Sequence, residues 1–223
     1  MNEESAYREA KNRIRSNLLK FTRQAFAVLP PLDKPRILDI GCGEGIPTLE
    51  LARLSNGEIT GIDIDEKALE ELSREADKSG LAERVKALNC SVTDMKFPEE
   101  SFDIIWSEGS IFTIGFKEGL REWKWLLRRG GFMIVHDEEG NLRKKLKTVK
   151  DSGLQLLEYI VLDRDTWWRE YYHPLQQLIS ETLSQSVDKE KIPEAASRDK
   201  KEIEWFDSSP GRNSSVYFIM QNT

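Results

Sequence analysis

The chain has few of the residues that mark secreted, zinc-binding or membrane proteins. It holds only two cysteines and two histidines among 223 residues. Cys42 and Cys90 form no CxxC pair, which fits a reducing compartment and gives no zinc signature. No apolar run is long enough to span a bilayer, and the opening stretch MNEESAYREAKNR has no apolar core of a signal peptide. We therefore expect a cytoplasmic protein with no membrane partner.

Positive charges are fewer than negative charges. Lysine and arginine number 33 against 39 aspartates and glutamates, which gives a formal net charge of -6. Because an acidic surface repels phosphate backbones, we expect no nucleic-acid partner. Hydrophobic residues make up 39% of the chain, enough for a real core, and the length suits a single domain over 1–223.

Short apolar runs alternate with segments of helical periodicity along most of the chain. The strand candidates are, in order, RILDI, EITGID, RVKALN, FDIIWS, GGFMIVHDE, LQLLEYIVL and SVYFIM. Strand alternating with helix predicts an α/β fold, in which a mostly parallel, doubly wound sheet of these strands has helices on both faces.

Two segments lie outside this alternation. Apolar residues spaced three and four apart predict an amphipathic N-terminal helix over 5–28, within a helical cap that we place at 1–30. A segment of roughly 163–213 separates the last two strand candidates and is too long for a plain connection. We expect this segment to form a helical lid or substrate insertion.

The stretch RILDIGCGEGIPTLELA runs a strand candidate into three glycines at alternate positions and then into a helix. Such a turn lets the backbone approach a ligand, because no Cβ is in the way. The spacing GxGxG is not the dinucleotide fingerprint, since Ile46 takes the place of its third glycine, and no P-loop lysine follows. A purely structural turn is the alternative.

Asp63 ends the next strand candidate, about twenty residues past the turn, where an acid can accept hydrogen bonds from both hydroxyls of a ribose. The alternative is a surface acid or a helix cap. Turn and acid together indicate a cofactor that has a ribose and no pyrophosphate, and S-adenosylmethionine fits that description.

Four stretches in this order resemble motifs of the class I S-adenosylmethionine-dependent methyltransferases: LDIGCGEG, ITGIDID, FPEESFDIIWSEGSIF and LLRRGGFMIVHDE. The third is similar to the branch that acts on small metabolites. The nucleic-acid amino-methylating branch has an Asn/Asp-Pro-Pro-aromatic motif at the place that reads SEGS here. The resemblance implies S-adenosylmethionine as cofactor and methyl transfer to a small-molecule acceptor by in-line displacement. The alternatives are a non-catalytic module that binds S-adenosylmethionine and a protein methyltransferase.

The resemblance also implies which residues touch the cofactor. Asp39 would lie near the methionine amino group, Asp63 would hold the ribose hydroxyls, and Ile64 would pack on the adenine. Ser91 aligns with a position after the third strand where the family often has an acid for the adenine amino group, and Ser107 would lie near the methionine end. The full implied set is Asp39, Gly41, Cys42, Gly43, Asp63, Ile64, Ser91, Val92 and Ser107.

Two candidates for the catalytic side follow the fourth and fifth strands. Glu108 stands where a methyl acceptor would meet the methyl group, and it can orient an amine, accept a proton, or simply bond to a helix N-terminus. His136 titrates near neutral pH and can act as a base, or be bonded to backbone instead. We expect no metal site of His136, Asp137 and Glu138, because neighbouring strand side chains point to opposite faces.

Tyr172 and His173 are candidates from the aromatic run WWREYYH inside the expected insertion. This run can close over the methyl acceptor and even embrace a cation. It can also fasten the lid to the sheet, or form the interface of a homodimer. We expect one or two of Tyr171, Tyr172 and His173 to face the pocket.

Overall fold

The computed structural model describes residues 3–185, 193–208 and 213–223. These residues form two compact units. We call one the sheet unit, made of the described residues of 21–161 and 215–223, and the other the helical unit, made of those of 1–20 and 162–214. Parts of the expected insertion, 186–192 and 209–212, lie outside the described residues.

The sheet unit is built on a seven-stranded sheet with the order β3-β2-β1-β4-β5-β7-β6. The first five strands pair in parallel, and β7 pairs antiparallel with β5. The strands are β1 (Arg36–Ile40), β2 (Glu58–Asp63), β3 (Val85–Asn89), β4 (Phe102–Glu108), β5 (Leu127–Glu138), β6 (Leu154–Leu162) and β7 (Ser215–Asn222). The predicted α/β fold with a mostly parallel, doubly wound sheet is confirmed.

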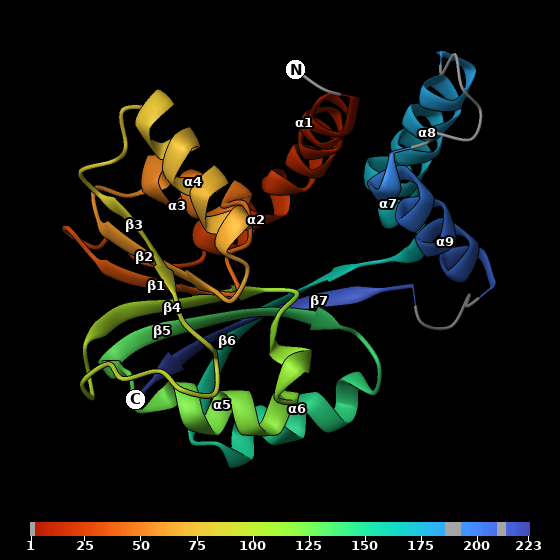
Figure 1. Cartoon of the computed structure of the whole chain (residues 1–223). Helices are drawn as coiled ribbons and strands as arrows, with labels where there is room; N and C mark the ends of the chain where they lie inside the picture. Colours follow the sequence, from red (N-terminus) through yellow and green to blue (C-terminus); the bar gives the residue numbers. More distant parts are fainter. Residues whose placement is uncertain (1–2, 186–192, 209–212) are drawn as a thin grey trace. The chain divides into compact units, whose positions relative to one another are not determined.

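Helices cover both faces of this sheet, as Figure 1 shows. One face carries α3 (Ile46–Leu54) and α4 (Glu66–Lys78), and the other carries α5 (Phe116–Lys124) and α6 (Leu142–Asp151). Central strand positions such as Ile104 and Ile105 are completely buried, one toward each face. This explains why the middle strands read as continuous apolar runs rather than as alternating ones.

The N-terminal segment is helical over most of the predicted range 5–28, but a 3-10 turn interrupts it. The segment consists of α1 (Glu3–Arg15), the 3-10 turn η1 (Ser16–Leu18) and α2 (Leu19–Phe26). The Ser16 hydroxyl donates to the Asn12 carbonyl at 2.9 Å, and such back-bonding often bends helices. The boundary between the two units also falls here, after Lys20.

The helical unit joins α1 to the chain between β6 and β7. That chain contains α7 (Arg164–Trp167), the π-helix η3 (Trp168–Tyr172), α8 (His173–Gln185) and α9 (Glu194–Ser208). The unit has its own apolar core, in which Tyr172 stacks on Phe206 with ring centroids 3.9 Å apart. None of the helices in the described part of the chain has the length and apolar character needed to cross a membrane.

One face of α1 binds α9 through three polar side chains at helical spacing. The Glu4 carboxylate accepts hydrogen bonds from the N–H groups of the first two residues of α9, at 3.0 and 3.3 Å. It thereby satisfies donors that a helix N-terminus leaves unpaired. The Tyr7 hydroxyl and the Lys11 ammonium both donate to the buried Asp199 carboxylate, at 2.9 and 2.6 Å.

We expect Asp199→Ala to lower the free energy of unfolding by about 3 kcal/mol, because it leaves the Lys11 ammonium and the Tyr7 hydroxyl without their acceptor inside the helical unit. Urea denaturation followed by circular dichroism measures this change. Glu9→Ala is the matched control on the same helix. Glu9 pairs with Arg13 in an exposed salt bridge, so its loss should cost no more than about 0.5 kcal/mol. Equal losses in the two variants would contradict the structural role of Asp199.

Candidate functional site

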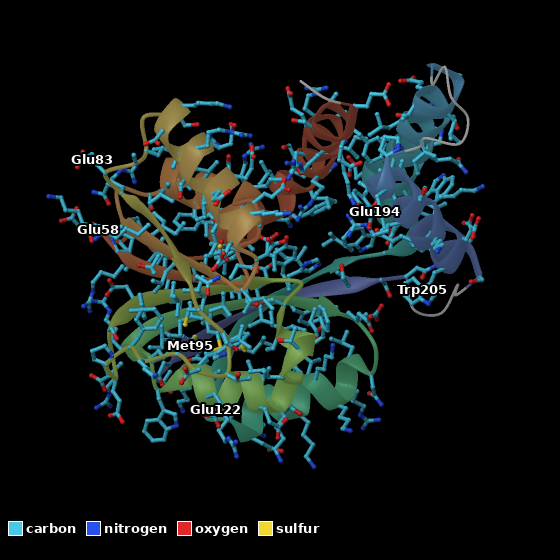
Figure 2. The ribbon with its side chains drawn as sticks, viewed as in Figure 1. Glu58, Glu83, Met95, Glu122, Glu194 and Trp205 are labelled. Atoms are coloured by element: carbon cyan, nitrogen blue, oxygen red, sulfur yellow. The ribbon has the colours of Figure 1, made fainter. Side chains whose placement is uncertain are left out.

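The carboxyl ends of β1, β2 and β4 bring together most of the polar residues singled out from the sequence. The strand order reverses between β1 and β4, since α3 follows β1 on one face and α5 follows β4 on the other. In open α/β sheets this switch point is where ligands bind. Figure 2 marks the opposite, amino edge of the sheet by Glu58, at the start of β2, and Glu83, just before β3.

The first two glycines of the turn after β1, Gly41 and Gly43, have different physical roles. A Cβ at Gly41 would lie 2.3 Å from the Cβ of Ser110, so this position must be glycine for the turns after β1 and β4 to pack together. A Cβ at Gly43 would meet no protein atom within 4 Å. The backbone at Gly43 therefore borders open space, and its φ of +52° also favours glycine.

Asp63 is tied to this turn by its carboxylate. One oxygen accepts the N–H of Gly43 at 2.9 Å, and the other accepts the N–H of Asp65 at 3.0 Å. The next residue, Ile64, is 72% exposed, which is unusual for a large apolar side chain. An acid and an exposed apolar surface thus stand side by side at the end of β2.

Asp39 is the buried acid of the site. Its carboxylate is 2% exposed and accepts a hydrogen bond from the Thr48 hydroxyl at 2.6 Å. Burial raises the pKa of Asp39 to about 7; the hydrogen bond from Thr48 opposes the rise, and the charges of Glu108 and Asp63 add to it. A cation bound beside Asp39 would favour its ionised form.

Cys42 lies inside the turn with its side chain buried. Burial, followed by the charges of Asp39 and Asp63, raises the pKa of its thiol far above the ordinary value. The thiol therefore stays protonated and behaves as a small apolar group.

Glu108 is held by side chains from three elements. Its Oε1 accepts the Thr22 hydroxyl of α2 at 2.9 Å and the Trp106 indole N–H of β4 at 2.8 Å. The hydroxyl of Tyr217, on β7, is hydrogen-bonded to Glu108 as well. The carboxylate is therefore fixed at the end of β4, partly exposed, while Thr22 and Tyr217 are buried.

His136 lies between Glu108 and Tyr217 in the register of the sheet. Its Nε2 is 2.7 Å from the Ser215 hydroxyl, and its ring stacks on that of Tyr217 with centroids 4.2 Å apart. Burial, and then the charge of Lys145, lowers the pKa of His136 to about 3, so the ring is neutral at neutral pH. Its role as a base stays a prediction, and its contacts are those of a packed ring.

The remaining cofactor candidates lie after β3 and on β4. Ser107 is completely buried, and its hydroxyl is 2.7 Å from that of Ser110. The Ser91 hydroxyl is 2.9 Å from that of Thr93, and Val92 packs against the core of the sheet unit. The contacts expected of these residues with a cofactor stay predictions.

Tyr172 and His173 belong to the helical unit. Tyr172 is buried and donates a hydrogen bond to Glu202 at 3.4 Å, whereas His173 is exposed, with its ring 5.9 Å from that of Trp168. Their expected roles at the methyl acceptor stay predictions. Among residues 3–185, 193–208 and 213–223, no group of three or more histidines, cysteines or acids is arranged to hold a metal ion.

Four hydroxyl residues of the site were not found from the sequence: Thr22, Thr48, Ser110 and Tyr217. Single hydroxyls have no periodicity, and Thr22 and Tyr217 come from the two ends of the chain. Ser110 had a usable sequence signal, because it closes the SEGS stretch after the fourth strand. In the structure its hydroxyl donates to the Ile40 carbonyl at 2.6 Å.

Comparison with known proteins gives a consistent result. Residues 37–131 match the family model described as a methyltransferase domain. The chain is 28% identical over 151 residues to 27-O-demethylrifamycin SV methyltransferase of Amycolatopsis mediterranei. That match covers 65% of this chain and 55% of the relative, so the chain spans about half the length of this curated relative.

Two solved structures share the fold. A putative sarcosine dimethylglycine methyltransferase from Galdieria sulphuraria has a TM-score of 0.73 at 16% identity, covering 94% of this chain and 86% of that one. The [4+2]-cyclase SpnF has the same TM-score at 18% identity, covering 91% and 80%. Likeness at these identities concerns the fold alone, and the reaction must be argued from the site.

The raised pKa of Asp39 predicts a pH-dependent stability that Asp39→Asn removes. Between pH 4 and 7 the folded protein keeps a proton that the unfolded chain releases, so stability from this group is present at low pH and is lost as pH rises to about 7. Relative to wild type, Asp39→Asn should gain about 2–3 kcal/mol of unfolding free energy between pH 5 and 8.

Urea unfolding of the cofactor-free protein at the two pH values measures this difference. The control is Asp77→Asn, an exposed acid on α4, which should leave the pH dependence unchanged. An Asp39→Asn protein whose stability follows the same pH curve as wild type would show that Asp39 is ionised in the folded state.

Proposed function

We propose that this chain is a class I S-adenosylmethionine-dependent methyltransferase that transfers a methyl group from S-adenosylmethionine to a small-molecule acceptor. The single observation that carries this proposal is the open backbone at Gly43, hydrogen-bonded to the carboxylate of Asp63. The matched range 37–131 contains this turn, this acid and Glu108. The curated relative is named for a small-molecule methyl acceptor, which supports this class of acceptor.

The residues of the switch point fit the chemical groups of the cofactor. In our proposal Asp63 accepts hydrogen bonds from the ribose hydroxyls, and Ile64 offers its exposed side chain to the adenine. The buried Asp39 faces the cationic methionine amino group, which would favour its ionised form. Gly43 lets the backbone lie against the ligand, because no side chain fills the space before it.

The cofactor supplies a methyl group that its sulfonium already activates. What the protein must add is alignment of the methyl acceptor and exclusion of water. We propose that Glu108 orients the methyl acceptor at the end of β4 and that the helical unit acts as the lid. The aromatic residues of η3 then serve first to build the core of that lid, since Tyr171 and Tyr172 are both buried in it.

Asp63→Ala should weaken S-adenosylmethionine binding by about 1–3 kcal/mol, the scale of lost hydrogen bonds to a charged group. Isothermal titration with S-adenosylmethionine and with S-adenosylhomocysteine measures the change, which should be similar for both because they share the ribose. Glu66→Ala, an exposed acid at the start of α4, is the matched control and should bind normally. Unchanged affinity in Asp63→Ala would remove the proposed ribose contact.

Gly43→Ala and Gly41→Ala should separate binding from packing. At Gly43 the added methyl group enters the open space, so we expect cofactor affinity to fall by about tenfold or more, with a loss of stability of about 1 kcal/mol from the positive φ. At Gly41 the methyl group collides with Ser110, so the larger effect should be on stability.

Titration calorimetry and thermal unfolding of both variants test this contrast. Retained affinity in a folded Gly43→Ala protein would place the ligand elsewhere.

A further inference from the structure

We infer that Thr22, Trp106 and Tyr217 fix the carboxylate of Glu108 so that the site favours methyl acceptors that become positively charged when they are methylated. Such an acceptor is an uncharged nucleophile, either an amine nitrogen or an alkene carbon. The inference rests on the proposed methyl transfer and deepens it, because it names the class of molecule that is methylated.

The geometry of this clamp is the first argument. We use the term clamp for the three side chains Thr22, Trp106 and Tyr217, which are at most 1% exposed. Each offers a neutral donor, two hydroxyls and one indole N–H, to the same carboxylate. These three donors orient the carboxylate and bring no positive charge of their own, unlike a lysine or an arginine.

Stacking on His136 also holds Tyr217 in its place within the clamp. Burial, and then the charge of Glu108, raises the pKa of Tyr217 well above its usual value, so the phenol keeps its proton. The His136 ring stacks on the Tyr217 ring at an interplanar angle of 17°, and His136 is in turn bonded to the Ser215 hydroxyl. His136 thus acts on the site through Tyr217, as a positioning residue.

The chemistry of the transfer explains what a fixed negative charge would do. The electron pair of the methyl acceptor forms a bond to the methyl carbon, and the carbon–sulfur bond breaks with its electron pair left on sulfur. The positive charge moves from sulfur to the methyl acceptor. A carboxylate already oriented beside an amine or an alkene stabilises this charge as it develops, whereas a carboxylate or phosphate acceptor would be repelled.

The poor placement of His136 as a base is the second argument. A phenol or alcohol must lose a proton to become a good nucleophile. His136 is the histidine of the sheet unit, and it is buried, stacked and bonded to Ser215. The charge of Lys145 disfavours protonation of His136. The charge of Glu108 acts on Tyr217, the ring on which His136 stacks. An alkene, or an amine that binds in its uncharged form, needs no base before it attacks.

The test compares a cation with its neutral isostere on the protein loaded with S-adenosylhomocysteine. Choline and 3,3-dimethylbutan-1-ol have nearly the same shape and differ in charge. We expect titration calorimetry to show that wild type prefers choline by about tenfold or more, and that Glu108→Gln reduces the preference to within about twofold. Equal binding of the two probes, no choline binding up to about 10 mM, or a preference that survives in Glu108→Gln would overturn the inference.

Variants of the clamp test positioning separately from folding. Tyr217→Phe and Thr22→Val should each lower the preference for choline by about threefold, with unchanged affinity for S-adenosylhomocysteine. Tyr159→Phe, on a half-exposed tyrosine of β6, is the matched control and should change neither value. Clamp variants that are folded and keep the full preference would show that Glu108 needs no clamp.

The affinities for the charged cofactor and its neutral product distinguish the inference from the proposed function. In Glu108→Gln the ratio of the two dissociation constants should stay within about twofold of wild type, and a tenfold loss for S-adenosylmethionine alone would assign Glu108 to the sulfonium and overturn the inference. Wild-type protein that binds neither molecule would contradict the proposed function itself.

Mass spectrometry of methyl transfer to a tertiary amine, a terpenoid alkene, a phenol and a carboxylate then tells nitrogen from carbon acceptors. Faster methylation of the phenol or the carboxylate would also overturn the inference.

Discussion

The site depends on one hydrogen bond, from the Ser110 hydroxyl to the carbonyl of Ile40 at 2.6 Å. This bond ties the turn after β4 to the turn after β1, at the place where these two segments leave the sheet toward opposite faces. Gly41 makes the approach possible, because any side chain there would collide with Ser110. With the two turns held together, Gly43 is left as a position where the backbone meets open space.

The acids of the switch point have three different surroundings. Asp63 is partly exposed and accepts two backbone N–H groups, Asp39 is buried with one hydroxyl donor, and Glu108 is held by hydroxyl and indole donors. Burial raises the pKa of Asp39 to about 7, and the charges of Glu108 and Asp63 add to the rise, so Asp39 is the acid that takes up the proton. Carboxyl groups thus provide a hydrogen-bond acceptor, a proton-holding group and an oriented side chain within one edge of the sheet.

The sequence was sufficient for the fold and for bringing the glycine turn and Asp63 together, and insufficient for the side that holds Glu108. Strand alternation, the glycine turn and Asp63 are local signals, because a strand, its turn and the following acid lie within one βαβ unit. Thr22 and Tyr217 are separated by almost the whole chain and meet only because β7 inserts beside β5. Burial is equally hidden from the sequence, and it decides that His136 is a neutral, stacked ring rather than an exposed group with an ordinary pKa. The 3-10 turn η1 was missed because the apolar spacing continues across it. The Ser16 hydroxyl that bonds to the Asn12 carbonyl there has no periodic signal in the sequence.

The helical unit is assembled from two distant parts of the chain, and this has a consequence for biosynthesis. Glu4, Tyr7 and Lys11 lie near the start of the chain, and their partners on α9 are about 190 residues further along. A ribosome adds about 5–20 residues per second, so α1 waits for roughly ten seconds or more before α9 is made. During that time the chain of β1 to β5 can already pair, and the apolar side of α1 is left without its native cover. Chaperones that shield nascent helices should therefore matter more to this protein than to relatives whose first helix packs on its immediate neighbours.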